Sequence, residues 1–136
     1  SSPSIVALPQ GGFEAAMAAN TGQLLTRGSS WVAWGDGVST GTTPSIIDQG
    51  SSVAVIFQAS GSNDLYYAWT GPISTPIPMV AGTSPAAVGL SSGGYEAAYV
   101  GVSSGDVIQT LGGLGSSTSP GPADAGPGAA PSIMHQ

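Results

Sequence analysis

Short apolar runs separated by turn residues make up most of the chain. The first four runs cover residues 4–8, 13–19, 23–27 and 31–34, and Gly, Ser, Asn and Pro fill the gaps between them. Runs of this length, bounded by such turns and without a 3.6-residue period, are typical of β-strands. The pattern therefore predicts an all-β chain without helices.

The strand pattern recurs along the chain. Residues 93–99 (GGYEAAY) repeat residues 11–17 (GGFEAAM) almost letter for letter, and a proline opens each copy. A period of about 40–45 residues is a signature of repeat architectures. The copies divide a single repeat domain, residues 1–136, into residues 3–43, 44–84, 85–130 and a partial fourth copy, 131–136.

The second run of each copy is apolar at both alternating sets of positions. It reads FEAAMA from position 13, VAVIFQ from position 53 and YEAAYV from position 95. A strand with one solvated face alternates more strictly, so these runs predict sheets that are covered on both faces. The Gly- and Pro-rich end of the third copy, residues 112–130, predicts a long loop or a weak outer strand there.

Two architectures use four-stranded units of about 40 residues: the β-propeller and the β-trefoil. The partial copy at 131–136 favours the propeller, in which an extra strand can complete a blade. Since a propeller has about four to eight blades, three blades cannot close a ring. We therefore predict a partial β-propeller of three four-stranded blades plus one strand of a fourth, completed by oligomerisation. The simplest assembly is a homodimer with six blades, and a β-trefoil is the alternative.

The charge balance excludes several partners. Arg27 is the one basic residue against seven acids, which gives a net charge of −6. Binding to nucleic acid needs Lys and Arg to displace counterions, and no apolar run approaches the roughly 20 residues of a membrane span. The sequence thus predicts neither a nucleic-acid partner nor membrane insertion. Low charge with abundant Ser, Thr, Gly and Ala points to a secreted protein, and the absence of cysteine excludes disulfides and thiolate chemistry.

Catalytic and metal-binding groups are sparse. His135 is the sole histidine and lies next to the C-terminal residue, where chain ends usually fray. Glu14 and Glu96 occupy the same position in copies one and three, with copy two between them. Unless they lie on the innermost strands, we expect them to be farther apart than the pair of carboxylates that a glycosidase needs. The aspartates are scattered, whereas a calcium loop gathers several oxygen ligands. We therefore predict no enzyme activity, no metal and no cofactor.

Aromatic residues in the late part of copies one and two form the better candidate site. Tryptophan and tyrosine rings stack on the C–H faces of sugars, and neighbouring amide, carboxylate and hydroxyl groups bind the sugar hydroxyls. The alternative role of such rings is packing between blades. The candidate ligand-binding residues are Trp31, Trp34, Tyr67, Trp69, Asn20, Gln23, Asp36, Asn63 and Asp64.

The repeat as a whole reads Pro-Ser-Ile, then Gly-Gly-(Phe/Tyr)-Glu-Ala-Ala, then Asn-Thr-Gly-x-Leu-Leu-Thr. It resembles repeats of secreted actinobacterial proteins. Over residues 3–111 it also looks like the blades of tachylectin-like and bacterial propeller lectins, although the third copy has no tryptophan. The resemblance implies short chains that assemble into one propeller and bind carbohydrate between blades. The alternative function is a non-catalytic structural or protein-interaction propeller, or a fragment of a larger secreted protein.

Overall fold

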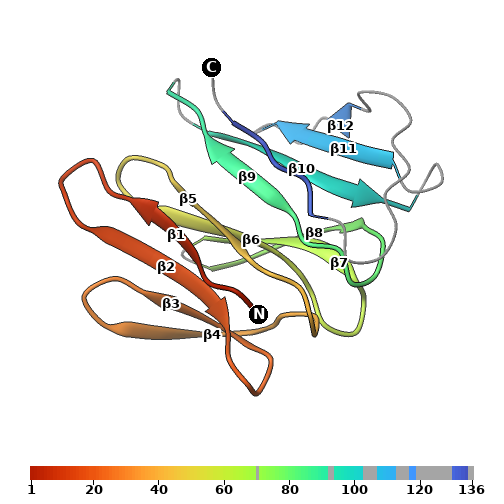
Figure 1. Cartoon of the computed structure of the whole chain (residues 1–136), viewed down its shortest axis with the longest axis horizontal. Coiled ribbons are helices and arrows are strands. Elements are labelled where there is room, and N and C mark those ends of the chain that lie inside the picture. Colours follow the sequence, from red (N-terminus) through yellow and green to blue (C-terminus); the bar gives the residue numbers. More distant parts are fainter. Residues whose placement is uncertain (70, 92–93, 103–106, 113–116, 119–129, 135–136) are drawn as a thin grey trace.

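The computed structural model of the chain describes residues 1–69, 71–91, 94–102, 107–112, 117–118 and 130–134. Within these residues all secondary-structure elements are β-strands, as the sequence predicts. The strands form three four-stranded antiparallel sheets that follow one another along the chain (Figure 1). No sheet closes on itself in this part of the chain. The described residues also contain no helix that is long and apolar enough to span a membrane.

Sheet 1 is built from the first copy and has the strand order β1-β2-β3-β4. Its strands are β1 (Ser4–Ala7), β2 (Phe13–Ala18), β3 (Gln23–Arg27) and β4 (Trp31–Gly37). The first three confirm the predicted runs to within one residue. The fourth is three residues longer than predicted, because after a bulge it resumes pairing and brings Gly37 opposite Gln23.

Sheets 2 and 3 repeat this order with the second and third copies. Sheet 2 contains β5 (Ser45–Asp48), β6 (Val53–Gln58), β7 (Asp64–Trp69) and β8 (Gly71–Pro78). Sheet 3 contains β9 (Ala86–Gly89), β10 (Tyr95–Gly101), β11 (Val107–Gly112) and β12 (Ser117–Thr118). The two-residue β12 matches the weak outer strand that was expected from the Gly- and Pro-rich sequence.

Each sheet has two faces that can be followed from copy to copy. Face A is defined by the position of Phe13, Val53 and Tyr95, and face B by the next position along each strand. The register supports this alignment, because Ser4 pairs with Ala16 just as the equivalent residues pair in the other two sheets. Side chains alternate between the faces along every strand.

The sheets stack face to face in chain order. Face B of sheet 1 packs on face A of sheet 2, and face B of sheet 2 packs on face A of sheet 3. The buried residues of the first interface are Ala16, Leu24, Val38, Ile46, Val55, Phe57, Ala59 and Ala68. Those of the second are Ile47, Ala54, Ile56, Leu65, Met79, Ala97 and Tyr99. Sheet 2 is thus covered on both faces, as predicted, whereas no described part of the chain covers face A of sheet 1.

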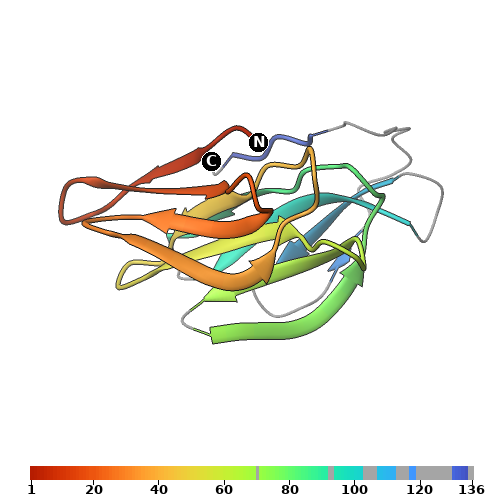
Figure 2. The same cartoon turned by 90° about the horizontal axis from the view of Figure 1, so that it is seen from below.

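The first strands of the sheets, β1, β5 and β9, lie side by side along one edge of the stack (Figures 1 and 2). The same hydrogen bond joins each to the next: Ile46 N donates to Ser4 Oγ over 3.2 Å, and Ala87 N donates to Ser45 Oγ over 3.0 Å. Gly89 lies so close to the carbonyl of Asp48 that a Cβ would collide with it. These contacts hold the first strands in tight register.

The turns that connect the sheets are also repeated. In the first, Thr42 Oγ1 donates to the carbonyl of Ser39 over 2.8 Å, and in the second Thr83 Oγ1 donates to the carbonyl of Val80 over 2.6 Å. The residue before each threonine is a glycine with positive φ, 83° at position 41 and 77° at position 82. Non-glycine residues rarely adopt this conformation, so Gly-Thr fixes each connection.

The described part of the partial fourth copy, residues 130–134, continues the series of first strands. In Figure 1 it follows β1, β5 and β9 across the molecule, and in Figure 2 it lies on the same side as β1. Its Pro131, Ser132 and Ile133 match Pro3, Ser4 and Ile5 of the first copy. His135 lies outside the described residues.

Candidate functional site

Two neighbouring hollows open between sheets 1 and 2, beside the end of β4. Their volumes are about 470 and 300 Å³, and Asp36 lines both. The larger hollow is lined by Thr21, Gly22, Gln23, Gly35, Asp36, Gly37, Val38, Thr40 and Ser60. The smaller is lined by Gly35, Asp36, Gly37, Phe57, Ala59, Ser60, Ser62 and Tyr66.

The peptide unit between Gly37 and Val38, next to Asp36, is fixed on both sides by hydrogen bonds. Ser60 N donates to the carbonyl of Gly37 over 2.9 Å, which ties β4 to the turn after β6. A Cβ on Gly37 would collide with the Ser60 hydroxyl, so glycine allows this close approach. Val38 N donates to the carbonyl of Gly22 over 2.7 Å, which fixes the other side. Asp36 is half-buried and lies one residue before this fixed peptide unit.

The chemistry of the two hollows suits a ligand rich in hydroxyl groups. Carboxylate, amide and hydroxyl side chains supply hydrogen-bond acceptors and donors, and Tyr66 supplies an aromatic ring that lies tilted against Phe57, with centroids 6.1 Å apart. None of the lining residues is basic. The site therefore favours a neutral polar ligand over an anion.

A larger hollow of about 750 Å³ lies at the ends of the first strands. Ile5, Ile46 and Val88 are among its lining side chains, so much of its wall is apolar. Its one acidic group, the Asp48 carboxylate, already accepts a hydrogen bond from Gly50 N at 2.9 Å. Specific ligand sites usually combine apolar walls with several convergent polar groups, and the hollows at Asp36 meet that description better.

The predicted tryptophans of sheet 1 lie on opposite faces. Trp31 is exposed on face A, where the Arg27 guanidinium carbon is 5.4 Å from the ring centroid. Trp34 is half-buried on face B, packs against the first interface and donates from Nε1 to Thr26 Oγ1 over 3.0 Å. Neither ring lines the hollows at Asp36. Trp34 thus takes the packing role that was the alternative for these aromatic residues.

Tyr67 lies in the second interface, one sheet away from both tryptophans. Its ring stacks on Tyr95 with centroids 4.9 Å apart and planes at 16°, and its hydroxyl donates to Gln49 Oε1 over 3.1 Å. Tyr67 therefore also packs between sheets. Trp69 ends β7, but its side chain lies outside the described residues.

The structure brings some of the predicted polar ligand-binding residues into a hollow and leaves the others outside. Gln23 and Asp36 come together in the larger hollow. Asn20 is exposed in the turn before β3. Asn63 has a φ of 59°, a turn conformation that asparagine tolerates better than most residues, and Asp64 follows it at the start of β7. These three residues do not line either hollow.

The stacked tyrosines predict a loss of stability at alkaline pH. Burial raises the pKa of Tyr95 above its ordinary value of 10.0. Burial also raises the pKa of Tyr67, and this effect outweighs the opposing one of the Gln49 hydrogen bond. In the unfolded chain both phenols ionise near pH 10. The stability that the two neutral phenols give to the folded chain is therefore fully present below that pH, and it is lost as the pH rises through the raised pKa values. Urea unfolding at a series of pH values from about 9 to 11 measures this loss.

The variant Tyr95→Phe provides the control for this pH effect. It keeps the ring stack on Tyr67 but removes one ionising phenol from the interface. We expect the free energy of unfolding of the variant to fall less steeply above pH 10 than that of the wild type. Equal slopes would contradict the assignment of the alkaline loss to this pair.

Sequence reasoning missed Ser60, Ser62, Thr21 and Thr40 as members of one candidate site. The repeat places most of them in turns, but only the stacking of sheet 1 on sheet 2 brings the turn after β6 next to the end of β4. Glu14 and Glu96 lie on sheets 1 and 3, with sheet 2 between them.

The described residues contain no cluster of three His, Asp or Glu side chains that could hold a metal ion. Comparison of the chain with protein-family models, with curated proteins and with solved structures finds no match.

Proposed function

We propose that the chain is a non-enzymatic, secreted carbohydrate-binding protein, lectin-like in mode of action, whose sheets are consecutive blades of a partial β-propeller. The ligand is a neutral sugar bound between sheets 1 and 2. The observation that carries this proposal is the pair of hollows that share the Asp36 carboxylate and combine it with an amide, several hydroxyls and an aromatic ring.

The stacking supports the propeller over the trefoil. Each sheet packs face to face on the next, and the first strands lie together at one edge. In a propeller, blades stack in this way with their first strands around a central channel. The hollows then lie at the outer ends of the blades, where the fourth strand of one blade meets the turn of the next.

Titration with a panel of neutral mono- and disaccharides tests the site, with amide chemical shifts and calorimetry as readouts. We expect at least one sugar to bind and to shift the amides around Asp36. Asp36→Asn should weaken this binding at least tenfold, which corresponds to about 1.4 kcal/mol, because the amide replaces a charged acceptor.

Asp64→Asn is the matched control, since Asp64 is also half-buried at a strand end but lines neither hollow. It should leave binding unchanged. The proposed site is wrong if no sugar in the panel binds, or if the two variants weaken binding equally.

A second candidate function, a protein-interaction module, is supported by a different observation. Large apolar side chains are exposed on face A of sheet 1, away from the hollows. Such patches mark interaction sites in soluble proteins.

A further inference from the structure

The polar side chains that line the two hollows at Asp36 are not used by the fold. Within the described part of the chain, the Asp36 carboxylate and the side-chain amide of Gln23 form no hydrogen bond or ion pair. The buried polar side chains nearby are all engaged, since Ser39, Thr42 and Gln58 each donate to a backbone carbonyl. The polar groups of the hollows are therefore free to bind a ligand.

The second interface shows that these polar groups are not required for sheet stacking. An isolated β-bridge joins the neighbouring sheets at the same place in both interfaces. This register puts Ile77 in the place of Asp36 and Val102 in the place of Ser60. Sheets 2 and 3 thus stack with apolar residues where sheets 1 and 2 carry a carboxylate and a hydroxyl. Packing does not explain the polar set of the first interface.

The two hollows differ in the groups that they offer. Gln23 and Thr40 are exposed on the wall of the larger hollow, so it presents an amide and a hydroxyl. The smaller hollow presents the ring of Tyr66 next to Phe57, which is 1% exposed. A sugar unit has both kinds of surface, because its rim carries hydroxyls and its ring face consists of C–H groups. The larger hollow suits the rim of one unit, and the smaller hollow suits the ring face of another.

The sizes of the hollows and their shared carboxylate also fit two units. Their volumes of about 470 and 300 Å³ each lie in the range of roughly 300–1,000 Å³ that is usual for small-molecule sites. Asp36 lines both hollows. A carboxylate can accept up to about four hydrogen bonds, so Asp36 can bind hydroxyl groups of a unit on each side.

We infer that the ligand is a neutral oligosaccharide that places two consecutive sugar units in the site, one in each hollow. The larger hollow binds its unit through the hydroxyl groups, and the next unit stacks its ring face on Tyr66. The Asp36 carboxylate accepts hydroxyl groups from both. This inference rests on the proposed function, a neutral sugar bound between sheets 1 and 2, and it adds the length and the orientation of the ligand.

Calorimetry with a monosaccharide and with linear disaccharides and trisaccharides of the same unit tests the length. Once one unit is bound, the second binds at the high effective concentration that the linkage sets. We expect the best disaccharide to bind about tenfold or more tightly than the monosaccharide, with one molecule per chain, and the trisaccharide to gain little more. Equal affinities for monosaccharide and disaccharides would overturn this inference and leave the proposed function intact, whereas no binding of any sugar would overturn both.

Amide chemical shifts locate the two units. The monosaccharide should shift the amides of Gln23 and Thr40, which line the larger hollow only. The disaccharide should shift these and also the amide of Ser62, which lines the smaller hollow only. A bound disaccharide that leaves the Ser62 amide unshifted would contradict the placement of the second unit.

Ser62→Trp blocks the smaller hollow. Ser62 is exposed, so an indole at this position fills the hollow without entering the core. The affinity for the disaccharide should fall about tenfold, to that for the monosaccharide, and the affinity for the monosaccharide should stay unchanged. Ser51→Trp is the matched control, because it places the same side chain on an exposed serine that lines neither hollow. Equal effects of the two variants, or an unchanged disaccharide affinity in Ser62→Trp, would overturn the inference.

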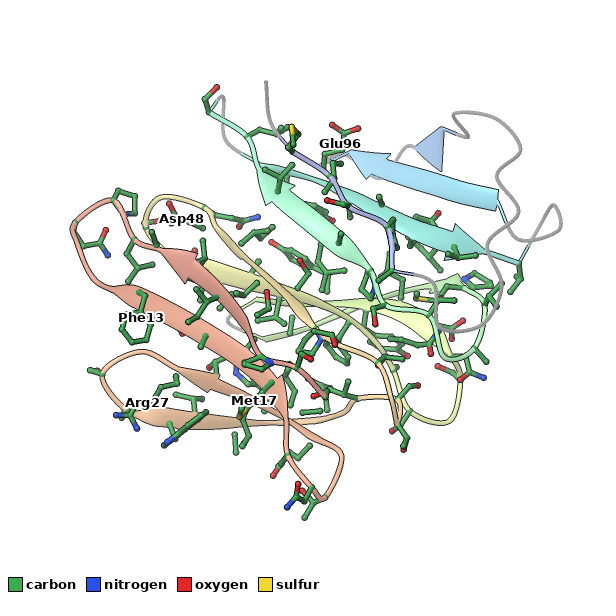
Figure 3. All side chains as sticks on the ribbon, viewed as in Figure 1. Phe13, Met17, Arg27, Asp48 and Glu96 are labelled. Atoms are coloured by element: carbon green, nitrogen blue, oxygen red, sulfur yellow. The ribbon has the colours of Figure 1, made fainter. Side chains whose placement is uncertain are left out.

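The hollow at the ends of the first strands is the competing location for the ligand. Asp48 lines it, and Figure 3 shows this residue at the end of β5, beside the turn to β6. Asp36→Asn should weaken the binding of both monosaccharide and disaccharide about tenfold, whereas Asp48→Asn should weaken neither. A larger loss of disaccharide binding in Asp48→Asn would place the ligand in that hollow and overturn the inference.

Discussion

Replacing Phe57 by alanine is expected to lower the free energy of unfolding by about 4 kcal/mol, the typical cost of removing a buried aromatic ring. Phe57 is 1% exposed in the first interface and contacts the ring of Tyr66. The substitution leaves a cavity between sheets 1 and 2, and the packed sheets cannot move together enough to close it. Since a domain of this size has a total stability of about 5–15 kcal/mol, urea unfolding followed by circular dichroism will show a large shift in midpoint.

The repeat supplies a control for this experiment. Met17 occupies the position of Phe57 in sheet 1, but face A is open there and the side chain is only partly buried. Met17→Ala should cost less, about 1.5 kcal/mol in dilute solution, because part of its side chain already contacts water. A similar cost for both variants would mean that sheet 1 is covered as sheet 2 is, which contradicts the stacking order.

Replacing Gln58 by leucine is expected to cost about 3 kcal/mol, although leucine is of similar size and more apolar. Gln58 is fully buried, its Nε2 donates to the carbonyl of Val80 over 2.8 Å, and its Oε1 accepts from Gly82 N at 2.9 Å. Leucine removes one donor to the Val80 carbonyl, which keeps its bond from Thr83 Oγ1, and leaves the Gly82 amide without the Gln58 acceptor. An unsatisfied buried group costs about 1–3 kcal/mol, and the lost side-chain hydrogen bonds add to it. The loss weakens the turn that connects sheet 2 to sheet 3.

Gln10→Leu is the control, because Gln10 is exposed in the turn after β1. It should change the free energy of unfolding by less than about 0.5 kcal/mol. Hydrogen exchange of the Gly82 amide gives a local readout, and it should speed up in Gln58→Leu but not in Gln10→Leu. Slow exchange of Gly82 in both variants would show that another group holds the connecting turn.

The strands and their grouping were predictable because both depend on local sequence. Gly, Pro and Asn mark the turns, and the period brings Pro3, Pro44 and Pro85 to equivalent places ahead of β1, β5 and β9. The end of β4 was missed, since Gly35, Asp36 and Gly37 read as a turn. They belong to β4 because pairing resumes after a bulge, with Gly37 opposite Gln23.

The candidate site was predicted only in part. Gln23 and Asp36 were named from the sequence, and they share a hollow. The aromatic cluster was inferred from proximity along the chain, whereas strand alternation sends Trp31 and Trp34 to opposite faces. Tyr67 stacks on Tyr95 from the next copy, a contact that depends on which sheets are neighbours and is not encoded within one copy.

The repeated connections have a consequence for how such a chain can vary in length. Between sheets 1 and 2 and between sheets 2 and 3 the same Gly-Thr turn and the same serine-to-amide bond recur. A whole unit can be duplicated or deleted between two such turns without creating a new kind of contact. Natural and engineered relatives should therefore differ in length mainly by whole units of the size that separates Thr43 from Ser84, 41 residues.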